Sequence, residues 1–221
     1  MMAKQTIVKE YLILCEGKDA FNFLCYYLNS SALSSDPRFS NDIQVIDFGG
    51  INELDGFIQV LKNTEGFKKV HHLLIIRDAE KDVSRALRMV KHSLNLCGFP
   101  TAENCNQWSS SEDGSFSTAY TLFPTCSAEP SEGALEDLCW ALLHGDNVLE
   151  FKSEVQGFVD HIKEKYQSII SHEHKSRLHT FFSVNEPFIS LKIGEAAKSG
   201  AFDWSNDKLI PLMRIISEGL A

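Results

Sequence analysis

Three short, mainly apolar runs constrain the fold most, because an amphipathic stretch follows each of them. The runs are residues 11–15 (YLILC), 43–48 (IQVIDF) and 72–76 (HLLII). Such runs are typical of strands buried on both faces, as in a parallel sheet. The stretches that follow are 19–29, 52–62 and a segment that ends near residue 96. Their apolar residues recur at helical spacing, which predicts helices.

The later part of the chain predicts one more strand and then mainly helices. The strand is expected at 118–123, and a helix at 132–143. Further helices are expected at 148–170, 175–182, 191–198 and 207–218. The polar residues 97–117 predict no defined element. The alternation of strands and helices predicts an α/β fold with a mostly parallel central sheet of about four strands flanked by helices. We expect a core at residues 1–145 and a helical extension at 146–221 packed on it.

Charge and cysteine spacing argue against several classes of protein. The formal net charge is −9, which disfavours broad nucleic-acid binding unless a basic patch or a bound metal reverses the local field. The six cysteines include no Cys-x-x-Cys pair, which argues against a structural zinc site, so we expect reduced thiols. The sequence shows neither an apolar signal region nor an apolar run as long as a membrane span. We expect a cytoplasmic protein with no membrane partner.

Acidic residues follow two of the predicted strands at the point where each strand ends. Glu16 comes directly after the first run, and Asp78, Glu80 and Asp82 follow the third. The carboxyl ends of parallel strands meet at the edge of the sheet where ligands bind. Carboxylate oxygens are ligands that Mg²⁺ prefers. The pattern predicts a magnesium site, and the alternative is that these residues cap the following helices.

Two segments also resemble a known family. LILCEGKDAFNFL and LLIIRDAEKD are similar to the TOPRIM domain of topoisomerases, bacterial primases and overcoming-lysogenization-defect nucleases. That family has a Glu after its first strand, matched by Glu16, and an acidic pair after a later one, matched by Asp78 and Glu80. Asp82 stands where some members carry a third acid. The resemblance covers residues 7–95 and implies a TOPRIM-like Rossmannoid fold.

Later segments resemble a narrower group of small, stand-alone bacterial TOPRIM-like proteins without an assigned activity. The segments are GALEDL, HKSRLHTFF and LKIGEAAKSGAFDW. In the related nucleases an acidic pair after the last core strand helps to hold a second metal. Glu136 and Asp137 match this pair by position and type. Lys192 lies where those nucleases place a basic residue near the metals.

The resemblance implies phosphodiester chemistry with Mg²⁺, or with Mn²⁺ as the alternative ion. Asp78 and Glu80 would hold the metal, and Glu16 would bind metal or transfer a proton. Lys18 and Lys192 are candidate phosphate contacts. Arg85 and Arg88 lie on one face of a predicted helix, which indicates either a phosphate track or a solvated surface.

Three functions remain open at this point. The first is a metal-dependent nuclease or related phosphotransfer enzyme that acts on nucleic acid. The second is a non-catalytic TOPRIM-like module that binds metal and a nucleotide or a protein partner. The third is an aspartyl phosphoacceptor with Asp78 as nucleophile. A zinc site at His172 and His174 is disfavoured, because side chains at positions i and i+2 of a helix do not point to the same side.

Overall fold

A five-stranded sheet lies at the centre of the computed structural model, which describes residues 6–50, 52–167, 170 and 172–221. The strand order is β2-β1-β3-β5-β4. The strands are β1 (Tyr11–Cys15), β2 (Ile43–Asp47), β3 (His72–Asp78), β4 (Ser109–Ser110) and β5 (Ser117–Phe123). The first three and β5 pair in parallel, and β4 pairs antiparallel with β5. The expected α/β class with a mostly parallel sheet is confirmed.

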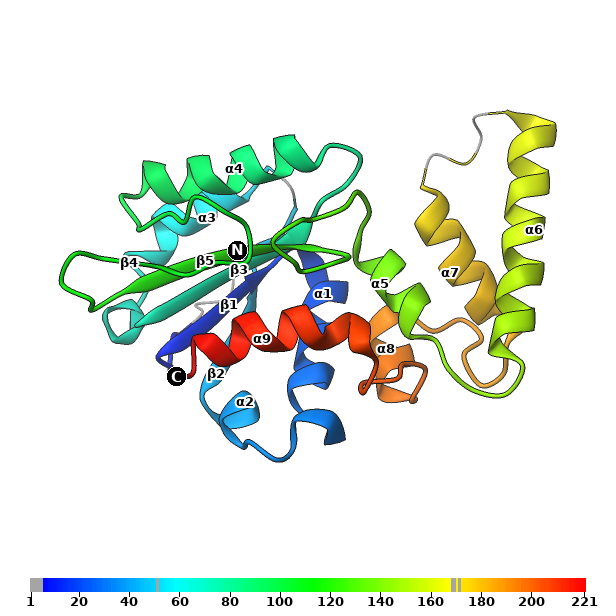
Figure 1. The fold of residues 1–221 in the computed structure, drawn as a ribbon, viewed down its shortest axis with the longest axis horizontal. Helices are drawn as coiled ribbons and strands as arrows, with labels where there is room; N and C mark the ends of the chain where they lie inside the picture. The colour runs from blue at the N-terminus through cyan, green and yellow to red at the C-terminus, as the bar shows by residue number, and fades with distance from the viewer. Residues whose placement is uncertain (1–5, 51, 168–169, 171) are drawn as a thin grey trace.

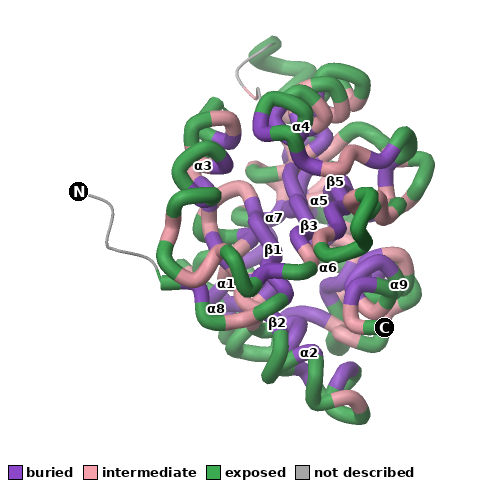
Figure 2. The backbone as a smooth tube through the Cα atoms, turned by 90° about the vertical axis from the view of Figure 1, so that its left-hand side faces the viewer, coloured by how far each residue is buried: buried purple, intermediate pink, exposed green. Residues whose placement is uncertain are grey.

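Side chains alternate between the two faces of this sheet, and each face has its own apolar core. In β3, Leu74 and Ile76 belong to one core and Leu73 and Ile75 to the other. All five residues of β1 and all seven of β5 are buried, as the continuous apolar runs predict for a sheet covered on both sides. Figure 2 shows buried strands surrounded by exposed turns of helix.

Helices cover both faces, as Figure 1 shows. The α-helices are α1 (Gly17–Leu28), α2 (Arg38–Asn41), α3 (Leu54–Leu61), α4 (Val83–Leu96), α5 (Leu135–Leu142), α6 (Val148–Tyr166), α7 (Glu173–Val184), α8 (Ile193–Lys198) and α9 (Ile210–Glu218). Short 3-10 helices lie at Ser31–Leu33, Phe67–Lys69 and Asp207–Leu209. Helices α3 and α4 contribute to the core that holds Leu73. Helices α1, α5, α7, α8 and α9 contribute to the core that holds Leu74.

The sheet has one strand more than the sequence predicts. The expected number was about four, and the additional strand is the two-residue β4, which lies in the segment 97–117 that predicts no element. Ser109 and Ser110 carry no apolar pattern. They become a strand through backbone pairing with Thr118 and Ser117. A turn closed by Asp113, which accepts bonds from Ser111 and Ser115, joins the two strands.

The C-terminal helices pack on the core, and several of their bounds differ from the predicted ones. The core that contains Leu74 also includes Phe181 of α7 and Leu212 of α9. The helix expected at 148–170 is described only to Tyr166, and residues 168 and 169 lie outside the described part of the chain. The helix expected at 207–218 begins as a 3-10 turn. The division of the chain at residue 145 stays a prediction.

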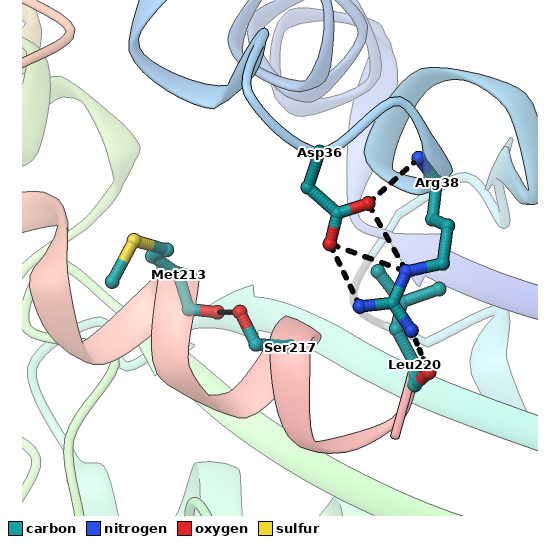
Figure 3. Close-up of polar contacts among 5 residues, drawn as sticks. All are labelled: Asp36, Arg38, Met213, Ser217 and Leu220. Carbon is teal, nitrogen blue, oxygen red and sulfur yellow. Dashed lines mark hydrogen bonds and ion pairs between the residues drawn. The ribbon is translucent and has the colours of Figure 1, made fainter.

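Polar contacts fasten the end of the chain to the sheet domain. Trp108 donates from Nε1 to the carbonyl oxygen of Ile215 in α9 at 3.0 Å. Figure 3 shows Arg38 bonded both to Asp36 and to the carbonyl oxygen of Leu220, the latter at 2.6 Å. The C-terminal helix therefore belongs to the folded body of the protein.

Two expectations from composition can be compared with the structure. All six cysteines carry free thiols, and Cys25 is the one among them that is partly exposed. Within the described residues, no helix combines the length and apolar character that crossing a bilayer requires.

Candidate functional site: carboxylates at the strand ends

Glu16 directly follows β1, and a left-handed glycine lets the chain turn there into α1. Gly17 has a φ of +82°, a backbone conformation that favours glycine. Asp47, at the end of β2, accepts bonds from the backbone N–H of Gly17 at 2.9 Å and of Gly49 at 2.8 Å. This carboxylate holds two turns at the edge of the sheet.

The Glu16 side chain lies beside Arg77, a residue that sequence reasoning missed. The parallel register pairs Cys15 with Ile76, so the next residues, Glu16 and Arg77, leave the same face of the sheet. Arg77 is only 1% exposed. Its Nε lies 3.4 Å from Oε2 of Glu16. Burial raises the pKa of Glu16, Arg77 counteracts that rise, and Glu80 adds to it.

Asp78 leaves the opposite face of β3, toward α5. Its Oδ1 accepts a hydrogen bond from the backbone N–H of Leu135, the first residue of α5, at 2.8 Å. Burial, followed by the charge of Glu136, raises the pKa of Asp78 to about 8, and the charges of Glu16 and Glu80 add to the rise. The carboxylates predicted from the sequence therefore act on one another.

Glu80 lies in the loop after β3 with an unusual backbone conformation. Its φ is +56°, in the left-handed region that few non-glycine residues adopt. Its N–H and C=O exchange hydrogen bonds with those of Gly133, at 2.8 and 2.9 Å. Gly133 has a φ of +129°, and a Cβ there would lie 2.6 Å from Oδ2 of Asp137. The bridge fixes the loop of Glu80 against the segment that leads into α5.

The acidic pair of α5 is held by two cations from α7, Lys175 and Arg177, which sequence reasoning also missed. Glu136 is buried, with 6% of its surface exposed, and Nζ of Lys175 lies 3.6 Å from its Oε1. Asp137 accepts from the backbone N–H of Ala134 at 2.8 Å and pairs with Arg177. Of the pair, Glu136 is the one whose charge acts on Asp78.

Other candidate residues lie farther from this centre or carry a structural bond. Asp82 is the N-cap of α4, and its Oδ1 accepts from the backbone N–H of Arg85 at 2.8 Å. The capping alternative therefore holds at this position, while its role as a metal ligand stays a prediction. Lys18 and Lys192 are exposed, and Lys192 directly precedes α8, outside the charges that act on Asp78. Their phosphate contacts stay predictions.

We call Glu16, Asp78, Glu80 and Glu136 the acidic cluster. Its donor atoms are all carboxylate oxygens, the chemistry that a hard cation such as Mg²⁺ requires. Oε2 of Glu16 is buried, and within the described residues it has no hydrogen-bond partner. With the side chains as they lie in the structure, however, no three His, Cys, Asp or Glu residues of the described part of the chain are arranged to hold one metal ion. The donor chemistry fits Mg²⁺, and binding would require side-chain rotation.

The missed residues left different signals in the sequence. An arginine directly after four apolar residues, in HLLIIRD, could have indicated a buried cation. Lys175 and Arg177 could not have been paired with Glu136 and Asp137, because about forty positions separate the members of each pair and only tertiary packing joins them.

Comparisons with known proteins place the whole chain in one family. No curated protein and no solved structure matches the chain. One family, described as a protein of unknown function (DUF3226), matches residues 10–218. Because this match covers nearly all of the sequence, including every residue of the acidic cluster, the chain belongs to the DUF3226 family.

Proposed function

We propose that the acidic cluster binds one or two Mg²⁺ ions and that the protein carries out phosphodiester chemistry on nucleic acid, as a TOPRIM-like nuclease. The observation that carries the proposal is the crowding of carboxylates around Asp78, whose pKa is raised to about 8. Arg77 and Lys175 offset part of the mutual repulsion in this cluster, and a bound proton or a bound cation would offset more of it. A divalent cation would also supply positive charge that neutralises a phosphate group.

Each side chain of the cluster has a distinct place in this proposal. Asp78 and Glu80 come from the end of β3 and the loop after it, and Glu136, in the first turn of α5, acts electrostatically on Asp78. These three are the proposed cation ligands. When bound, Mg²⁺ would neutralise a phosphate and stabilise charge that develops in the transition state.

Glu16 is suited to proton transfer. Burial raises its pKa, which brings a carboxyl group closer to neutral pH, where a general acid or base is most effective. The neighbouring Arg77 stabilises its ionised form. Burial and Arg77 therefore act on the pKa of Glu16 in opposite directions, and burial is the larger effect.

The test is cleavage of nucleic acid by the full chain. Single- and double-stranded DNA and RNA are incubated with Mg²⁺ or Mn²⁺, with Asp78→Asn beside the native protein. The asparagine keeps an oxygen that can accept from the N–H of Leu135, so the variant is expected to fold. We expect Asp78→Asn to lower the cleavage rate by about 100-fold or more.

Asp146→Asn is the matched control, because Asp146 is an exposed residue in the turn before α6. It should cleave like the native protein. Cleavage that persists unchanged in Asp78→Asn, or that continues in EDTA, would refute the proposal.

A second function is favoured by one observation, namely the formal net charge of −9, which disfavours binding of nucleic acid. We propose as the alternative a non-catalytic TOPRIM-like module that binds metal and a nucleotide or protein partner. Calorimetric titration with Mg²⁺ distinguishes the two. Binding that Asp78→Asn abolishes, without cleavage of any of the four substrates, supports the module.

A further inference from the structure

Arg77 is a buried cation that the acidic cluster does not fully use. Nε faces Glu16, and Nη1 donates to Sδ of Met89 in α4 at 3.9 Å, a weak contact. Nη2 is buried, and among the described residues no hydrogen-bond partner is available to it. An arginine normally satisfies its donors when buried, because an unpaired buried N–H is costly. Such an arginine indicates a missing acceptor.

Two cavities meet at this residue. The first has a volume of about 310 Å³ and lies between α3 and α4. The second has a volume of about 350 Å³ and lies between the β3–α4 loop, α4 and His172. Arg77, Arg85 and Met89 line both cavities. We call the two together the basic groove.

The wall of the groove along α4 is cationic. Arg85, Arg88 and His92 line the first cavity, and Lys81 and Arg85 line the second. The helical rise is about 1.5 Å per residue, so Arg85, Arg88 and His92 follow one another at about 4.5 and 6 Å along the axis. Lys81, Arg85 and Arg88 form a row of cations along this wall, and such a row suits a ligand with repeated negative charges better than a single anion.

The acidic residues of the groove are partly engaged by the protein itself. In the first cavity, Asp55 accepts a hydrogen bond from Ser93. In the second, Asp82 is held as the cap of α4. Glu80 also lines the second cavity and belongs to the acidic cluster. The groove therefore leads from a cationic wall to the proposed metal ligands.

We infer that the basic groove binds the phosphate backbone of a single nucleic-acid strand, with Arg77 at its floor and Arg85 and Arg88 on its wall. Arginine matches phosphate oxygens in a bidentate way. The inference deepens the proposed function by naming a single strand as the ligand and by locating its path. Binding itself requires no metal, so the two can be tested separately.

The experiment measures binding of a fluorescently labelled ten-nucleotide thymidine strand to the full chain in EDTA, by fluorescence anisotropy at several salt concentrations. The double variant Arg85→Ala/Arg88→Ala removes two exposed cations of the groove. We expect it to weaken binding by about tenfold or more, and to reduce the slope of log Kd against log salt by about 1.4, which corresponds to 0.7 for each lost phosphate contact on a single strand.

The matched control is Lys198→Ala/Arg214→Ala, which removes two exposed cations of α8 and α9. It should bind within about twofold of the native protein. Equal binding by the two double variants would overturn the inference. So would displacement of the strand by AMP at matched concentration, because that result assigns the groove to a mononucleotide.

Two further variants complete the test. Arg77→Lys keeps the charge but loses the planar fork, and we expect weaker strand binding at an unchanged melting temperature. If Arg77→Lys has a lower melting temperature than the native protein, the inference is judged only by the binding of the Arg85→Ala/Arg88→Ala variant. Asp78→Asn should bind the strand in EDTA at least as tightly as the native protein. If the protein does not cleave nucleic acid, the inference about the basic groove can still hold. If the strand does not bind, the proposed metal site can still hold.

Discussion

Arg77 and Asp78 are consecutive in β3, yet the first lines the basic groove and the second belongs to the acidic cluster. The alternation of a strand sends them to opposite faces of the sheet. Arg77 meets α4, and Asp78 meets the start of α5. Glu16 connects the two sides, because it pairs with Arg77 and its charge also raises the pKa of Asp78. The comparison teaches that one step along a strand can separate a surface lined by arginines from a group of interacting carboxylates.

The largest effect is expected from removing the buried cation itself. Arg77→Met removes the cation that pairs with the largely buried Glu16, and loss of one partner of a buried pair costs about 3–5 kcal/mol. For a chain of this size that corresponds to a melting temperature lower by roughly 10 °C. Denaturant unfolding at pH 7 measures the change.

The double variant Glu16→Gln/Arg77→Met sharpens this prediction. It removes both charges, so we expect it to recover much of the lost stability. If the double variant is no more stable than Arg77→Met, the cost comes from packing around Met89 and not from the stranded charge of Glu16. Arg214→Met is the control for loss of an exposed arginine.

The acidic side predicts an effect of opposite sign. The pKa of Asp78 rises from 3.8 to about 8 on folding. Its contribution to stability is therefore greatest below about pH 4, falls as the pH rises through this interval, and is lost above pH 8. Asn does not titrate, so Asp78→Asn should be as stable as the native protein at pH 4 and more stable at pH 9, by at least about 2 kcal/mol or roughly 5 °C.

Melting curves from pH 4 to pH 9 in EDTA measure this difference. Glu16 also has a raised pKa, but its burial and its contact with Arg77 are the same in both proteins, so only its coupling to Asp78 enters the difference. Adding Mg²⁺ at pH 9 should narrow the gap, because a cation would relieve the repulsion in the native protein alone. A gap that does not depend on pH would contradict the assignment of Asp78 as a crowded carboxyl group.

The contrast between the two sides also shows what a sequence can predict. The run 11–15 coincides with β1, because a strand buried on both faces is apolar at every position. The run 72–76 ends two residues before β3 does, because pairing of Arg77 and Asp78 with Leu122 and Phe123 extends the strand beyond the apolar residues. Pairing with a distant strand has no local signature.

The same limit applies to the candidate site. The positions of Glu16 and Asp78 at strand ends follow from the apolar runs that precede them. The charge of Glu16 raises the pKa of Asp78, which agrees with their placement at the same edge of the sheet. The capping of α5 by Asp78 joins residues 57 positions apart in the chain. The two-residue strand β4 and the ion pairs of the α7 cations likewise depend on tertiary contacts, which leave no pattern in the local sequence.

The smallest effect concerns Asp82, whose carboxylate has two possible roles, as the cap of α4 and as a metal ligand. Its side chain caps α4 at the edge of the basic groove, and its position after Glu80 also makes it a predicted metal ligand. Asp82→Ala removes both roles and should cost about 1 kcal/mol, the usual value for a lost N-cap. Asp82→Ser keeps a capping oxygen but removes the charge, so its stability in EDTA should equal that of the native protein. If Asp82 only caps the helix, Mg²⁺ should raise the melting temperatures of Asp82→Ser and the native protein equally. A smaller rise in Asp82→Ser would assign this carboxylate to the metal and extend the acidic cluster to the edge of the basic groove.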